Sequence, residues 1–206
     1  MTDKTTQKTQ DPFIHLHLHS EYSLLDCENK IDDLLERVKS FGMSAVAVTD
    51  HGNLYGAFEF YSKALAANIK PILGIEAYVA IGDRKERKQT GIRDGGFHLV
   101  LLAENNIGWN NIVKLSSDSF LNGFYYRPRM DHSTLEQYAE GIIAINGHLG
   151  SSIAYHLCRF VDTGEQSDWD NAIKEAKWHA KTFSPNEKGD PRFYIELQRH
   201  DVQDQI

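Results

Sequence analysis

Histidines and carboxylates occur in this sequence at spacings that suit a metal site. His17 and His19 are one residue apart, so in an extended segment both imidazoles lie on the same face. Glu76 interrupts an apolar stretch, and a buried carboxylate is costly unless a partner such as a metal ion offsets its charge. The candidate ligands are His17, His19, Asp26, His51, Glu76, His98 and His148. Mixed imidazole and carboxylate ligands favour Zn²⁺, Mn²⁺ or Fe²⁺ over Ca²⁺ and Mg²⁺.

Apolar periodicity predicts the elements that position these side chains. The predicted strands cover residues 13–19, 45–49, 71–80, 98–102, 142–145 and 193–197. The predicted helices cover residues 31–41, 54–65, 107–120, 151–160 and 169–183, and Asn29 is a candidate cap for the first of them. The predicted apolar face consists of Ile31, Leu34, Leu35, Val38 and Phe41 in the first helix, and of Leu54, Phe58, Tyr61 and Leu65 in the second. Residues 84–96 are charged and glycine-rich, which is typical of an exposed loop. Alternating strands and helices with short links predict an α/β fold with a parallel sheet closed into a (β/α) barrel.

In such a barrel, functional side chains gather where the strands end, because the loops there converge on the mouth. His17 and His19 end the first predicted strand, His51 directly follows the second, and His148 follows the strand that ends at residue 145. His98 is the exception, since it begins its predicted strand. The spacing of the other ligands therefore predicts a shared site at one end of the barrel.

The bulk composition limits the class of protein. A formal net charge of −7 argues against a broad basic surface that grips nucleic acid. No run of 18 apolar residues occurs, and residues 1–12 are polar, so we expect a flexible lead rather than a signal peptide. Cys27 and Cys158 form neither a CxxC pattern nor a secreted framework, which fits a reducing cytosol. These features predict a cytoplasmic protein.

Longer strings of sequence carry a resemblance to a known family. The segments HLHLHSEYSLLD, TDHGNLYGAFEFY and KPILGIEAYVA resemble the opening motifs of the polymerase and histidinol phosphatase (PHP) family. FHLVLLAENNIGWNNIVKLSS and GFYYRPRMD resemble the segment that follows in the branch found in alpha subunits of bacterial DNA polymerase III. The likeness runs from about residue 13 to residue 200, and the family's metal-binding pattern falls on the seven candidate ligands named above.

The resemblance implies a distorted (β/α)7 TIM-like barrel of the PHP type over residues 13–206, with up to three divalent ions (Zn²⁺, Mn²⁺ or Fe²⁺). The family pattern ends with Asp-X-His, which does not occur in this sequence, so we expect the last strands to be missing. Many polymerase members carry Cys at the position of His148, whereas free phosphoesterases of the family carry His. Either residue type can bind a metal ion.

For function, the resemblance implies phosphate-ester hydrolysis with a metal-activated water as nucleophile. In a replicative polymerase this predicts a 3′ to 5′ exonuclease that serves proofreading or pyrophosphate removal. Its partners would be the DNA primer 3′ end and the other subunits of the polymerase III holoenzyme. One alternative is a non-catalytic structural module that braces the polymerase or docks a separate proofreading exonuclease. Another is a free PHP phosphatase, which His148 favours and the GFYYRPRMD segment opposes.

Several other polar residues are candidates for contact with substrate or ligands. Arg127 and Arg129 could bind backbone phosphate, although loop arginines are commonly solvated. The tyrosines at 125 and 126 could stack on a base or pack against the barrel rim. Glu196 and His200 could orient a metal ligand, or form a cap or surface pair.

Overall fold

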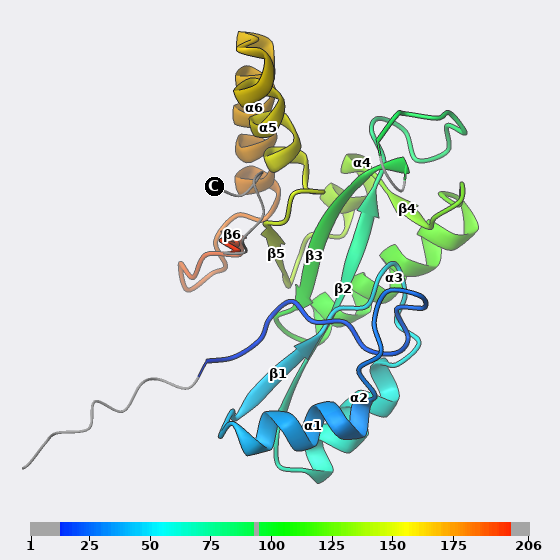
Figure 1. Cartoon of the computed structure of the whole chain (residues 1–206), viewed down its shortest axis with the longest axis vertical. Helices are drawn as coiled ribbons and strands as arrows, with labels where there is room; N and C mark the ends of the chain where they lie inside the picture. Colours follow the sequence, from blue (N-terminus) through cyan, green and yellow to red (C-terminus); the bar gives the residue numbers. More distant parts are fainter. Residues whose placement is uncertain (1–12, 93–94, 199–206) are drawn as a thin grey trace, which may run out of the picture.

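A six-stranded mixed sheet runs through the centre of the computed structural model, with helices at both ends and along one face (Figure 1). The structure describes residues 13–92 and 95–198. The strands are β1 (Ala45–Val48), β2 (Lys70–Val79), β3 (Phe97–Ala103), β4 (Arg129–Met130), β5 (Ile142–Asn146) and β6 (Phe193–Ile195). The helices are α1 (Ile31–Ser40), α2 (Ala57–Ala66), α3 (Asn106–Leu121), α4 (His132–Gln137), α5 (Ser152–Thr163) and α6 (Gln166–Thr182). The predicted α/β class is thus confirmed, while β4 and α4 are additions to the predicted elements.

The direction of β3 corrects the predicted parallel sheet. The strand order is β1-β2-β3-β5-β6, with β4 beside β2. β3 is antiparallel to both β2 and β5, and the remaining pairs are parallel. The described part of the connection between β2 and β3 contains no α-helix, so it reverses the chain instead of carrying it across the sheet. Within the described residues this order is open, and the predicted barrel does not close.

The first predicted strand, residues 13–19, is irregular in the structure. It lies beside β1, because the backbone N–H of Ala47 donates to the carbonyl of His15 and that of Thr49 to the carbonyl of Leu18, both at 2.8 Å. The donors are two residues apart and the acceptors three apart, so a regular ladder cannot form. The alternation of His and apolar residues therefore belongs to an irregular segment beside β1 rather than to a strand.

The amphipathic face of α1 is as predicted except for Phe41, which follows the helix and is 56% exposed. The predicted cap is wrong. Ile31, Leu34, Leu35 and Val38 are buried against β1 and α2. The N-cap position is Lys30, and the side-chain amide of Asn29 donates to the carbonyl of His19 instead. Asn29 therefore ties the start of α1 to the segment that carries the candidate ligands.

The predicted apolar face of α2 is wrong. Phe60 and Ala64 are fully buried in the core shared with α1 and β1, whereas Phe58 is 83% exposed. Tyr61 and Leu65 are also exposed. Aromatic and aliphatic residues surround this short helix, so periodicity alone could not identify the side that meets the sheet.

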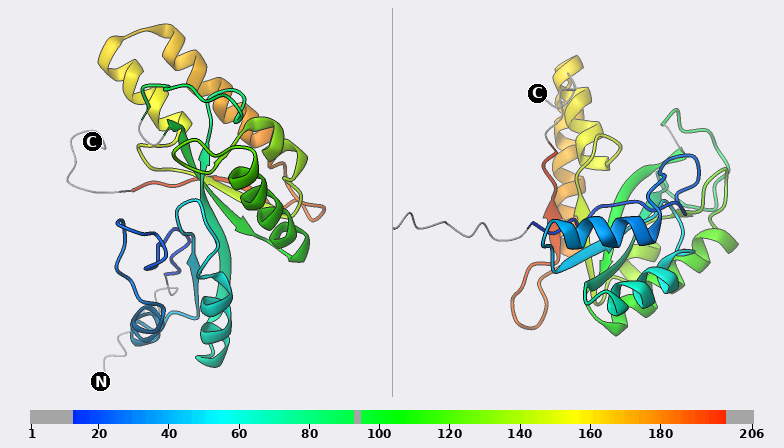
Figure 2. Two further views of the ribbon diagram at one scale, coloured as in Figure 1. Left: turned by 90° about the vertical axis from the view of Figure 1, so that its right-hand side faces the viewer. Right: turned by 60° about the horizontal axis from the view of Figure 1, so that its bottom comes forward.

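Helix α3 packs on the face of the sheet opposite to the candidate ligands. Its Ile112 and Leu115 are buried in one core with Ile75, Leu101 and Ile142 from the sheet. α5 and α6 form a hairpin at one end of the molecule, and α1 and α2 lie at the other end (Figure 2). No helix among the described residues is long and apolar enough to span a membrane.

Candidate metal centre

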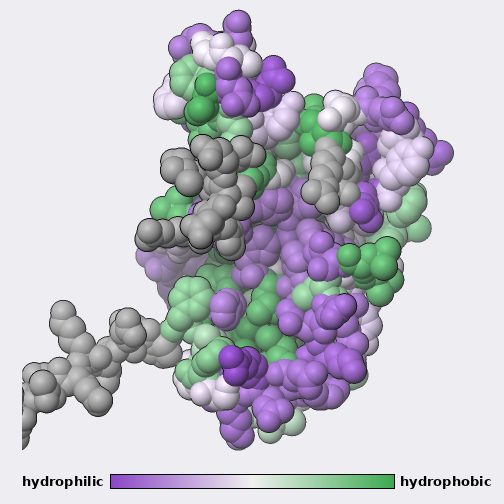
Figure 3. All heavy atoms as spheres, viewed as in Figure 1, coloured by the Kyte–Doolittle hydropathy of each residue, from purple (hydrophilic) through white to green (hydrophobic). Residues whose placement is uncertain are grey.

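Strand geometry places Glu76 on the face of the sheet that α3 does not cover. Its neighbours Ile75 and Ala77 point into the α3 core, so alternation along β2 turns Glu76 to the other side. Hydrophilic residues gather in the middle of this face (Figure 3). His98 lies directly opposite Tyr78 across the β2–β3 pair, and both share the face of Glu76. Because β3 is antiparallel, its first residues meet the end of β2, which explains why a candidate ligand begins a strand.

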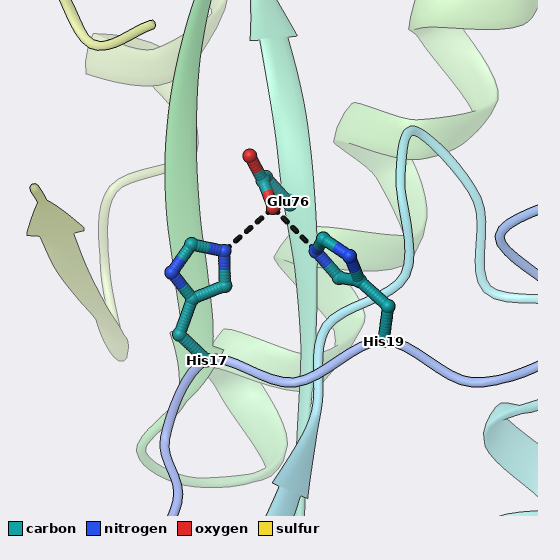
Figure 4. A group of neighbouring side chains, drawn as sticks. All are labelled: His17, His19 and Glu76. Atoms are coloured by element: carbon teal, nitrogen blue, oxygen red, sulfur yellow. Dashed lines mark hydrogen bonds and ion pairs between the residues drawn. The ribbon is translucent and has the colours of Figure 1, made fainter. Parts of the chain in front are cut away.

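The carboxylate of Glu76 is the centre of a ring of imidazoles. Its side chain is 0% exposed. Its Oε2 lies 2.6 Å from His17 Nε2 and 2.5 Å from His19 Nε2 (Figure 4). Its Oε1 lies 2.7 Å from His98 Nδ1 and 2.8 Å from His148 Nε2. A carboxylate can only accept, so each of these nitrogens must carry a proton or face a cation that both groups share.

Asp26 and His51 extend the ring towards solvent. Asp26 Oδ2 lies 3.1 Å from His19 Nδ1 and 3.0 Å from His51 Nε2. The other ring nitrogen of His51, Nδ1, is buried without a hydrogen-bond partner, 3.8 Å from Glu76 Oε2. An orphaned imidazole nitrogen beside a buried carboxylate fits a metal ion that both would bind. Among the described residues, three groups could each hold an ion: His17, His19 and Glu76; His19, Asp26 and His51; and His51, Glu76 and His98.

The seven predicted ligands therefore lie together, with His148 joined to the three groups through Glu76. Their role as ligands remains a prediction. Glu196, a candidate for orienting a ligand, accepts from His17 Nδ1 at 2.8 Å. His200 lies outside the described residues.

Asp50 is a positioning residue that the sequence patterns did not reveal. It is 2% exposed and accepts from the backbone N–H of Ser20 and the hydroxyls of Ser20 and Ser23 at 2.7 to 2.8 Å. The Ser23 oxygen in turn accepts from the backbone N–H of His51 at 3.0 Å. These bonds tie the loop that carries Asp26 to the end of β1. An acidic residue directly after a buried apolar strand was the available signal.

The charges of the centre are strongly coupled. Burial alone would raise the pKa of Glu76, but hydrogen bonds from His148, His17, His19 and His98 hold it far below its usual range. Burial opposes a proton on His17, yet its hydrogen bonds to Glu196 and Glu76 raise its pKa to about 9. A metal ion bound at His17 must therefore displace a proton there.

The two predicted phosphate-binding arginines have different surroundings. Arg127 is exposed and lines the same cavity as the candidate ligands, with its guanidinium carbon 5.5 Å from the centre of the Tyr78 ring. Arg129 is 2% exposed and donates to the carbonyls of Gly123, Arg84 and Glu86 at 2.7 to 3.1 Å. Its guanidinium thus hydrogen-bonds to backbone carbonyls, and its burial leaves it poorly placed to bind a phosphate.

Comparison with known proteins places this chain among its relatives. The PHP domain family matches residues 15–200. The DNA polymerase III subunit alpha of Borreliella burgdorferi is 45% identical over 193 residues, which cover 94% of this chain and 16% of that protein. The subunit of the same name from Thermus aquaticus is 44% identical over 196 residues, covering 94% of this chain and 15% of the relative. The chain thus spans about a sixth of the length of these relatives.

Among solved structures, an amidohydrolase from Chromobacterium violaceum is similar at a TM-score of 0.47 and 13% identity, over 82% of this chain and 83% of its own. The family match covers most of the described residues and all seven candidate ligands. The chain belongs to the PHP domain family.

Proposed function

We propose that this chain is a metal-dependent phosphoesterase module of a bacterial replicative DNA polymerase alpha subunit, and that it hydrolyses phosphodiester bonds at the 3′ end of DNA. One observation carries the proposal: a fully buried Glu76 is surrounded by four imidazole nitrogens, beside a buried nitrogen of His51 that has no hydrogen bond within the described part of the chain. A buried carboxylate in such a ring is stabilised by shared cations. The names of the relatives support the polymerase context.

The donor atoms suit divalent ions of the transition series. Imidazole and carboxylate ligands fit Zn²⁺, Mn²⁺ or Fe²⁺, and the three groups allow up to three ions. His19, His51 and Glu76 each belong to two groups, so ions held by them would be neighbours. Bound there, divalent ions would lower the pKa of a water molecule and neutralise charge on a phosphodiester.

The chain's own residues supply orientation. Glu196 accepts from Nδ1 of His17, which fixes the imidazole so that Nε2 faces the centre. Asp50 holds the Ser20–Ser23 turn, and with it the start of the loop that carries Asp26. Arg127 is exposed on the cavity wall, where a guanidinium can bind a phosphate oxygen.

Three finer expectations belong to the same proposal. Family membership supports the distorted (β/α)7 barrel, of which the described residues form an open sheet. The polymerase relatives support the DNA primer 3′ end and the other holoenzyme subunits as partners, and a cytoplasmic location. The same relatives oppose a free PHP phosphatase.

The test is hydrolysis by the metal-loaded chain. With Mn²⁺ or Zn²⁺, the chain should shorten a 5′-labelled single-stranded oligonucleotide and cleave bis(p-nitrophenyl) phosphate. Glu76→Gln and His17→Asn should slow both reactions by about 100-fold or more. Glu175→Gln is the matched control, because Glu175 also contacts a histidine but belongs to none of the three groups. A chain that binds no metal and cleaves neither substrate would instead be the structural module.

A further inference from the structure

Exposed aromatic side chains border the cavity that holds the candidate ligands. Four of them, here called the aromatic rim, are Tyr55 (63% exposed), Phe120 (37%), Phe124 (49%) and Tyr126 (75%). All four line the same cavity as Glu76. Hydrophobic residues border the hydrophilic centre of this face in Figure 3. Large apolar rings are thus held in water next to the candidate metal centre.

Three rings of the aromatic rim, those of Tyr55, Phe120 and Phe124, follow one another. The ring centres of Tyr55 and Phe120 are 6.3 Å apart. Those of Phe120 and Phe124 are 6.2 Å apart with an interplanar angle of 24°, which is close to parallel. Near-parallel exposed rings leave flat faces on which another flat ring can stack.

Two loops at the mouth of the cavity each expose a large side chain from a residue whose backbone conformation is unfavourable. Tyr126 has φ of 60° and Leu25 has φ of 65°, in the left-handed region that glycine favours. Leu25 is fully exposed and lines the same cavity from the other loop. Neither side chain gains burial that would offset this strain in the free chain. Such strain at a cavity mouth is typical of residues that contact a ligand.

We propose that the aromatic rim binds the bases of a single-stranded polynucleotide whose end enters the candidate metal centre. This inference rests on the proposed function and adds to it the groups that hold the strand. Bases stack on exposed aromatic rings whatever their sequence. Arg127, next to Tyr126 in the chain, lines the cavity where the strand's phosphate would pass.

The size of the cavity favours this occupant over a small phosphate ester. The cavity volume is about 1290 Å³, larger than the roughly 300–1000 Å³ typical of small-molecule sites, so more than one nucleotide fits. The net charge of −7 opposes general electrostatic attraction of a polyanion. Stacking on the rim would supply affinity that charge does not.

The test measures binding without catalysis. An oligonucleotide with 2-aminopurine near its 3′ end is titrated with the chain in EDTA, and stacking is followed by fluorescence quenching. Tyr126→Ala and Phe124→Ala should each weaken binding by about 5- to 100-fold and reduce the quenching. Phe58→Ala is the matched control, because Phe58 is 83% exposed but does not line the cavity, and it should change neither readout.

Two further measurements separate stacking from other causes. Tyr126→Gly should raise the melting temperature, since it relieves the positive φ, yet weaken binding as Tyr126→Ala does. The logarithm of the binding constant should fall with the logarithm of salt concentration with a slope near −0.7, as for about one phosphate contact. Unchanged affinity and quenching in Tyr126→Ala and Phe124→Ala would overturn the proposal and leave the rim to a protein partner. A slope of several units would also overturn it.

The outcome for the rim is distinguishable from the outcome for hydrolysis. If the rim is assigned wrongly, both rim variants bind the oligonucleotide normally while the chain still cleaves bis(p-nitrophenyl) phosphate. If the phosphoesterase proposal is wrong, no hydrolysis occurs with any metal, whatever the oligonucleotide experiment shows. Quenching that depends on Tyr126 in EDTA would support the rim in either case.

Discussion

Replacing Glu76 with glutamine should remove most of the metal from this chain. Glu76 belongs to two of the three groups that could hold an ion, and the group of His19, Asp26 and His51 lacks it. Glutamine keeps the shape of the side chain but carries no charge. We therefore expect the metal-loaded variant to retain at most one ion per chain where the wild type holds up to three, as measured by plasma mass spectrometry after unbound metal is removed.

The same substitution should weaken the stabilisation by metal. An ion present at 100 times its Kd stabilises the folded state by about 2.7 kcal/mol. In a domain of this size, 1 kcal/mol corresponds to about 2 to 4 °C in Tm. Each ion lost should therefore reduce the metal-dependent rise in Tm by about 5 to 11 °C, measured by thermal unfolding with and without Mn²⁺.

Glu175→Gln is the control, since Glu175 contacts His132 at 3.4 Å away from the centre. It should keep the wild-type metal ratio and the wild-type Tm rise. The reasoning is refuted if Glu76→Gln binds as much metal as the wild type. It is refuted equally if both variants lose the same amount.

Three further predictions concern the residues around the centre. Arg129→Met leaves three backbone carbonyls without their hydrogen-bond donor. It should lower the free energy of unfolding by about 2 to 5 kcal/mol in urea titrations. A loss below about 1 kcal/mol would contradict the structural role. Burial alone would raise the pKa of Asp131, but hydrogen bonds from Arg84 and nearby groups hold this pKa well below its usual range. Its carboxylate therefore stabilises the fold above about pH 4, and this contribution is lost as the pH falls below that value. The difference in unfolding free energy between wild type and Asp131→Asn should shrink between about pH 6 and pH 2, and a constant difference would contradict this reasoning. Gly52→Ala would place a Cβ 2.9 Å from the Tyr78 ring, at a backbone φ of +64°. It should lower the free energy of unfolding by about 1 to 3 kcal/mol and reduce the metal content. An unchanged Tm would count against this close contact.

The assembly of the ligands could be predicted because it follows from local patterns. His17 and His19 share a face through their spacing, and β2 turns Glu76 away from its apolar neighbours. His51 follows a buried strand that is paired with β2 in parallel, so the chain reaches the same region. The first two steps depend on residues close together in the sequence, and the third depends on the pairing of two strands that a single helix connects.

Strand direction and helix burial could not be predicted in the same way. Nothing in the apolar pattern of β3 distinguishes a parallel from an antiparallel neighbour. The sequence therefore does not explain why His98 begins a strand, whereas the antiparallel direction of β3 does. The faces of α2 were ambiguous because both carry aromatic residues, and the sheet covers only the one with Phe60. These outcomes depend on contacts between distant segments.

Burial separated residues of the same type as well. Arg127 and Arg129 are two positions apart, yet one is exposed on the cavity wall and the other is enclosed by backbone carbonyls. Asp50 directly precedes the candidate ligand His51, yet its carboxylate accepts three hydrogen bonds inside the protein. Residue type specifies the chemistry available, and the fold decides whether it serves a ligand or the structure.

Anomalous diffraction from crystals of the chain grown with Mn²⁺ or Zn²⁺ would test the shared metal centre most directly. We predict at least one anomalous peak between Glu76 and the imidazoles of His17 and His19, about 2.0 to 2.2 Å from the ligand atoms. Absence of any peak there, with these side chains still hydrogen-bonded directly to one another at full metal concentration, would contradict the account.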